Sequence, residues 1–186
     1  MAAGTFGTFL IIGPVCFFLG ILFASFPYDY NVIWTTPEGP RDVYFNILED
    51  HLKFLHASPP IISRILHIVI GTGLLGFLTK LYKASQANML FDGASLVLYM
   101  AGITVYITNI VKGLRVVTAG IYGNVDVKDD ENADDYISRE DTLRVFAASN
   151  TILALVLWYA LRKEEAEIKE IEEKEQERKA AGKKKQ

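Results

Sequence analysis

This chain of 186 residues has few of the residues from which metal and catalytic sites are built. It contains one cysteine, Cys16, which excludes an intrachain disulfide and a zinc cluster of cysteines. Of its three histidines, His51, His56 and His67, the first two are five residues apart and therefore lie on different faces of a helix. It contains no Gly-rich phosphate loop and no nucleophile elbow. These absences argue against an enzyme and against a bound cofactor.

The chain also lacks an excess of positive charge and a site for N-linked glycans. Its formal net charge is −3, which does not fit a nucleic-acid-binding protein. The charged residues gather in the segments between apolar runs and above all after Arg162. Hydrophobic residues make up 51% of the chain, more than an average soluble domain carries.

What the sequence has in abundance is long apolar runs, which cover residues 5–26, 60–81, 90–111 and 143–161. Each is close to the roughly 20 residues with which a helix crosses a hydrocarbon core, and each is apolar on all sides. No Lys or Arg precedes the first run, which is also longer than the apolar core of a signal peptide, so we expect an uncleaved membrane helix. The sequence predicts an all-α integral membrane protein with four transmembrane helices.

This pattern divides the chain into a membrane domain, residues 1–161, and a charged cytosolic tail, residues 162–186. Pro27 is expected to end or kink the first helix. Within the first long loop, residues 27–59, apolar residues recur at helical spacing over 41–57 and indicate an amphipathic helix on the membrane surface or against the bundle.

The second long loop, residues 112–142, is acidic between Asp126 and Asp135. It does not fit a calcium-binding EF-hand, because Lys128 stands at a ligand position and Glu131 where a turn glycine is required. We expect a solvated, flexible loop.

Small and polar residues within the runs indicate contacts between helices. Gly13, Cys16 and Gly20 share one face of the first helix, and the second helix has a similar face at Gly71, Gly73 and Gly76. Asn109 is expected to hydrogen-bond to another helix. No pair of carboxylates is expected inside the membrane, which argues against a transporter with an acid–base relay.

Four crossings place both termini on one side of the membrane. Lys80, Lys83, Arg162 and Lys163 also fall on that side, which the bias of Lys and Arg identifies as cytosolic. Lys112 and Arg115 fall on the opposite side and do not fit this rule. The two long loops are then luminal or exterior.

The tail alternates Glu with Lys and Arg, and several Glu residues precede a Lys by four positions, which indicates a solvated helix continuing the fourth span. Lys183 and Lys184 stand fourth and third from the end of the given sequence. At a cytosolic C-terminus this is the dilysine pattern that returns membrane proteins to the endoplasmic reticulum, so both residues are candidates for a retrieval signal.

Residues 26–31, Phe-Pro-Tyr-Asp-Tyr-Asn, resemble a signature of the fungal packaging chaperones for amino-acid permeases. The resemblance covers roughly residues 6–160, whereas the tail is similar only in being charged and rich in lysine. It marks as candidate client-binding or structural residues Pro27, Tyr28, Asp29, Tyr30, Asn31, His56, Pro59, Asn109, Ser149 and Asn150.

The resemblance implies a four-helix protein of the endoplasmic reticulum membrane. Such a protein binds newly made permeases as transient clients, prevents their aggregation and promotes their packaging into transport vesicles, and its tail is expected to meet vesicle coat components. Two alternatives remain open: an assembly subunit of a stable membrane complex, which constant stoichiometric recovery with one partner would indicate, and a membrane enzyme or transporter, which a catalytic cluster or a water-filled cavity would indicate.

Overall fold

A computed structural model describes residues 3–35, 39–82, 86–123 and 137–183, and within these ranges the regular elements are all helices. The elements are α1 (Ala3–Ile33), α2 (Arg41–His56), α3 (Pro60–Tyr82), α4 (Gln86–Val105), the π-helical segment η1 (Tyr106–Val111), α5 (Lys112–Ala119) and α6 (Arg139–Lys183).

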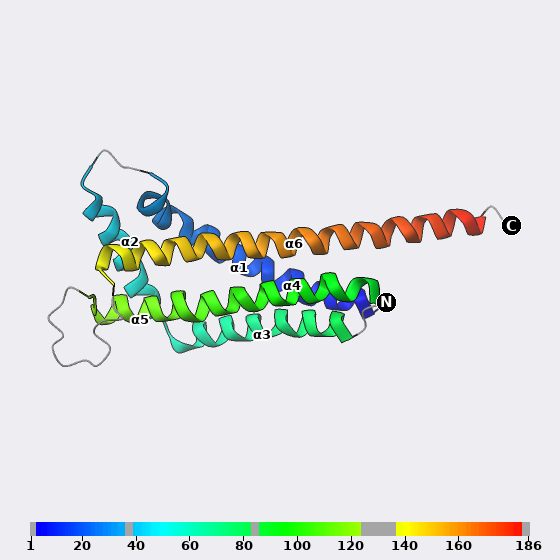
Figure 1. Cartoon of the computed structure of the whole chain (residues 1–186), viewed down its shortest axis with the longest axis horizontal. Coiled ribbons are helices and arrows are strands. Elements are labelled where there is room, and N and C mark those ends of the chain that lie inside the picture. Colours follow the sequence, from blue (N-terminus) through cyan, green and yellow to red (C-terminus); the bar gives the residue numbers. More distant parts are fainter. Residues whose placement is uncertain (1–2, 36–38, 83–85, 124–136, 184–186) are drawn as a thin grey trace.

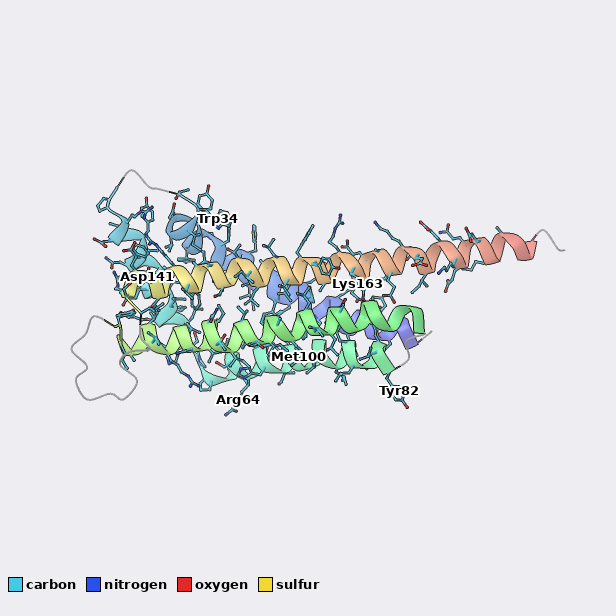
Figure 2. The ribbon with its side chains drawn as sticks, in the orientation of Figure 1. Trp34, Arg64, Tyr82, Met100, Asp141 and Lys163 are labelled. Atoms are coloured by element: carbon cyan, nitrogen blue, oxygen red, sulfur yellow. The ribbon has the colours of Figure 1, made fainter. Side chains whose placement is uncertain are left out.

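Four helical stretches are long and apolar enough to cross a membrane, which confirms the predicted fold class. They are α1, α3, the continuous helix formed by α4, η1 and α5, and the first part of α6. Figure 1 shows them side by side, with α2 and α5 at one end of the bundle. We call this end of the bundle the α2 end. The opposite end, where α1 begins, is called the tail end, because α6 projects beyond it.

The first helix was expected to end at Pro27 or to kink there. It does not end there but continues to Ile33, with Pro14 and Pro27 inside it. Proline removes one backbone donor, and membrane helices tolerate it where neighbouring groups compensate. Residues 27–33 are therefore helical, and only residues 34–40 of the expected loop separate α1 from α2. The amphipathic helix predicted over 41–57 is confirmed as α2, with Phe45, Leu48 and Leu52 buried on one face.

The third span, made of α4, η1 and α5, also runs beyond its expected end at residue 111. It widens to a π-helix in η1 and continues as α5 to Gly120, whose φ of 66° forms a left-handed C-cap. The expected loop 112–142 thus begins with two helical turns. Its acidic residues 126–135 lie outside the described residues.

The fourth span, α6, begins at Arg139, four residues before the expected start, because Ser138 caps the helix. The Asp141 backbone N–H donates to Ser138 Oγ at 3.2 Å, and that hydroxyl donates to Asp141 Oδ2 at 2.7 Å. From there α6 runs without a break for 45 residues, about 68 Å. The predicted continuation of the fourth span into the tail is confirmed.

Two of the five glycines expected to form packing faces lie in tight contacts. A Cβ at Gly76 would lie 2.8 Å from Ile11 Cγ1, and one at Gly73 would overlap the Tyr99 ring, so these glycines let α3 approach α1 and α4. By contrast, a Cβ at Gly13, Gly20 or Gly71 would meet no described atom within 4 Å. The face expected on α1 is therefore uncovered.

Candidate functional site

Asp29 and Asn150, two of the residues identified by the resemblance, meet inside the bundle. Asn150 Nδ2 in α6 donates to Asp29 Oδ2 in α1 at 2.8 Å, and Asp29 is only 2% exposed. The second oxygen, Oδ1, is buried without a hydrogen-bond partner among the described residues. An unpaired buried polar atom costs stability, so this contact specifies which faces of α1 and α6 meet.

Asn109 and Ser149 form a second polar contact between spans. Asn109 Nδ2 in η1 donates to Ser149 Oγ at 2.9 Å, and that hydroxyl donates to the Val145 carbonyl at 2.7 Å. The predicted cross-helix bond of Asn109 is confirmed. The adjacent residues Ser149 and Asn150 thereby attach α6 to two different spans.

The other residues of the segment 27–31 lie on different sides of α1. Tyr28 faces inward and stacks on His51 of α2, with ring centroids 3.8 Å apart and planes within 6°. Pro27 is exposed, and Tyr30 is 43% exposed with its ring 5.6 Å from Phe26. Asn31 Oδ1 accepts a hydrogen bond of 3.2 Å from Thr35 Oγ1. The segment therefore both builds the bundle and presents an outer surface.

The remaining sequence candidates lie outside this polar core. His56 ends α2, and the Pro59 carbonyl accepts a hydrogen bond of 3.0 Å from the Ile62 N–H in the first turn of α3. Lys183 is the last residue of α6, and Lys184 lies outside the described residues.

At the tail end of the bundle, a buried cluster of charges joins α3, α4 and α6. Lys80 Nζ donates to Glu164 Oε2 at 2.8 Å and to Glu167 Oε2 at 2.5 Å. Lys163 Nζ donates to Asp92 Oδ1 at 2.8 Å, and Asp92 lies 3.9 Å from Lys80. The first turn of the tail is therefore packed against the bundle, not solvated as expected.

This cluster was not predicted from the sequence, and its buried carboxylates lie at the tail end of the bundle. Glu164 is 1% exposed and Asp92 is also buried. The available signal was Asp92, an acid inside the third apolar run, which requires a cation at the same depth. Identifying Lys80 and Lys163 as its partners depends on helix packing that is not visible in the sequence.

A second charged cluster, around Glu49, joins α2 to the start of α6. Glu49 accepts hydrogen bonds of 2.5 Å from Arg139 Nε and 3.4 Å from Tyr122 Oη, and it pairs with Lys53 at 2.7 Å. Burial by itself would raise the pKa of Glu49, but the bonds from Lys53 and Arg139 hold it below its usual 4.5. Burial and the charge of Glu49 raise the pKa of Tyr122 to about 12.

A partly open cavity of about 540 Å³ lies between the spans and α2. It brings together all three histidines, which looked scattered in the sequence, with Arg115 of α5. Among the described residues, no group of three or more His, Cys, Asp or Glu side chains is placed to hold a metal ion. The polar groups of the cavity can instead donate hydrogen bonds to an organic or phosphate-bearing group.

Residues 2–186 match the family model of the SHR3 chaperones, described as ER membrane protein SH3. The chain belongs to this family. No curated protein and no solved structure gave a match.

Family membership defines what the chain does. It is a multi-pass chaperone of the endoplasmic reticulum membrane that packages amino-acid permeases, and the family is non-enzymatic. The resemblance found in the sequence is confirmed, and amino-acid permeases are the clients that the family implies.

Proposed function

We propose that the chaperone holds partly folded permease helices against the outer face of α1, while the end of α6 acts on the cytosolic side in vesicle packaging. The observation that carries the first part is the small-residue face at Gly13, Cys16 and Gly20. It lies on the outside of the bundle with Cys16 exposed.

The outer face of α1 continues into the segment that the resemblance identified. Pro27 and Tyr30 follow Gly20 at helical spacing and are exposed on the same side, whereas Tyr28 and Asp29 point inward. Small residues let a second helix approach closely in lipid, where no hydrophobic force joins helices. A face of this kind suits weak, reversible contact with many clients.

The single cysteine allows a direct test, because Cys16 lies within this face. A thiol-reactive crosslinker in native membranes is expected to join Cys16 to permeases. A control chain with Cys16→Ser and Leu75→Cys moves the thiol to an exposed position on α3. Equal permease capture from both positions would contradict this client site.

Bulky substitutions test the same face by function. Gly13→Leu and Gly20→Leu are expected to reduce permease export while the chaperone still folds, because both positions are open. Gly71→Leu on α3 is the matched control, since it too has no described atom within 4 Å. Unchanged export with the α1 variants would count against the proposal.

For the tail, the Lys80 cluster supports a division of roles, in which the membrane domain holds the permease and the rest of α6 promotes packaging. The boundary between these two parts of the chain then lies after Leu161. Glu164 and Glu167 belong to the bundle by their contacts, so we propose that the membrane domain extends through Glu167. A chain ending at Lys169 is expected to prevent permease aggregation and to lose the export that depends on coat contacts. If this chain exports permeases normally, the tail has no packaging role.

We place both termini in the cytosol, where Lys183 and Lys184 would serve as a retrieval signal. Because the chain has no Asn-x-Ser/Thr site, an introduced site reports its own side of the membrane. A site between Gly123 and Ile137 is expected to be glycosylated, and one after Gln186 is not. The opposite result would reverse the orientation. Lys183→Ser with Lys184→Ser is expected to let the chaperone escape to later compartments.

A further inference from the structure

The lining of the cavity changes from apolar to polar along the bundle. Its deep part, toward the tail end, is made by apolar side chains from four spans, including Phe18, Ile70, Ile103 and Leu157. Tyr99 also lies there, but its hydroxyl donates to the Ile70 carbonyl at 3.0 Å and is satisfied. This part of the cavity suits a hydrocarbon chain.

The rim, at the α2 end, carries the hydrogen-bond donors. Arg115 is exposed there and forms no ion pair with any residue that the structure describes. The Ser63 hydroxyl and the imidazole groups of His51, His56 and His67 complete the rim. Ser58 also lines it, but its hydroxyl donates to the Phe54 carbonyl at 3.2 Å. The cation and neighbouring donors favour an anionic oxygen-rich group such as a phosphate.

Apart from Asp29, the described lining residues of the cavity carry no carboxylate. Asp29 is the acidic residue of the lining, but Oδ2 is occupied by Asn150 and Oδ1 is closed off from solvent. Glu49, the other acid near α2, is held by Arg139, Tyr122 and Lys53. The rim is therefore electrostatically complementary to an anion.

We propose that this cavity binds one bilayer glycerophospholipid, with its phosphate at Arg115 and an acyl chain in the apolar part between α1, α3, α4 and α6. The volume of about 540 Å³ lies within the roughly 300–1,000 Å³ of small-ligand sites. The apolar lining suits one acyl chain, and the cation of Arg115 at the rim suits the phosphate attached to it.

The position of Arg115 agrees with a membrane headgroup. About six turns of helix precede it within the span Asp92–Ala119, and only four residues follow it there, so the side chain lies toward the interface and not at the bilayer centre. A phospholipid entering sideways from the bilayer would keep its phosphate near headgroup depth. Such a lipid would fill the space between α2 and the spans.

The test uses the full-length chaperone in bilayer nanodiscs containing a phosphatidylserine with a photoreactive acyl chain. Irradiation is expected to label the segments around Ile103 and Leu157. Native mass spectrometry of the detergent-purified chaperone is expected to show one retained phospholipid per chain. A photoreactive diacylglycerol, which lacks the phosphate, is the control probe and is expected to label these segments about tenfold less.

Matched variants separate the lipid site from general contact with the bilayer. Arg115→Gln is expected to reduce labelling about tenfold, whereas Lys112→Gln, a cation on the same helix outside the cavity lining, leaves it unchanged. Gly102→Leu and Ser25→Leu each place a larger side chain in the cavity and are expected to displace the lipid. Gel filtration of each variant verifies folding, and either filling variant suffices if the other misfolds.

Three results would overturn the proposal. The first is equal labelling by both probes, and the second is equal labelling of the Arg115→Gln and Lys112→Gln variants. The third is that a permease, and not phospholipid, becomes crosslinked to the segments around Ile103 and Leu157. The third result would make the cavity a client site.

Discussion

The carboxyl group of Asp29 and the side-chain amide of Asn150 are joined by a hydrogen bond of 2.8 Å, although 121 positions separate the two residues in sequence. Asn109 reaches Ser149, the neighbour of Asn150, at 2.9 Å. Polar residues that the resemblance identified singly thus form two contacts between spans. These polar groups lie inside the bundle, so the outer face of α1 that we propose as the client site consists mainly of small and apolar residues.

Replacing one partner of the Asp29–Asn150 pair is expected to destabilise the bundle more than replacing both. Asp29→Leu or Asn150→Leu leaves one buried polar group without a partner and should cost about 1–3 kcal/mol, whereas the double variant should be nearly neutral. Unfolding in mixed micelles measures all three. Additive single effects would show that the two residues do not interact.

The Lys80 cluster should make the bundle depend on the first turn of the tail. Lys80→Ala leaves Glu164 and Glu167 unpaired, one of them fully buried, and should cost about 3–5 kcal/mol. Lys174→Ala removes the exposed 2.5 Å pair with Glu170 and should leave stability nearly unchanged, because solvent screens such a pair. Both are measured by thermal unfolding in detergent. Similar losses would mean that Lys80 is not buried as described.

Protonation of His51 should make the folded chaperone less stable as the pH falls. Burial lowers the pKa of His51 below its usual 6.5, so the unfolded chain takes up the proton first as the pH falls. The contribution of His51 is complete above pH 6.5 and is lost as the pH falls through the folded pKa. His51→Phe retains a ring to stack on Tyr28 and cannot titrate. Its melting temperature should therefore change less than that of the wild type between pH 7 and 5.

Glycines of the same helix should differ sharply in their tolerance of a methyl group. Gly76→Ala places a Cβ 2.8 Å from Ile11 and 3.0 Å from the Leu10 backbone, and should cost about 1–3 kcal/mol by overpacking. Gly71→Ala meets no described atom within 4 Å and should be neutral or stabilising, because alanine favours a helix by about 1 kcal/mol. Equal effects in thermal unfolding would contradict the close approach of α1 and α3.

The fold class and the spans could be predicted from the sequence because their signals are local. A run of about 20 apolar residues has one stable arrangement in a bilayer, since every backbone donor and acceptor must be satisfied within the helix. The amphipathic period of α2 and the charge alternation of the tail are local in the same sense. The ends of the spans were harder to predict, because Pro27 and residues 112–119 remain helical when neighbouring groups support them.

Only the tertiary structure decided which polar groups meet. The sequence marked Asp29, Asn109, Ser149 and Asn150, but whether each faces a partner helix, a client or lipid depends on the rotation of four helices about their own axes. That rotation is determined by side-chain packing between residues far apart in the chain, as Lys80 and Glu164 illustrate. For this reason the uncovered face of α1 and the cavity beside α2 emerge only from the assembled bundle.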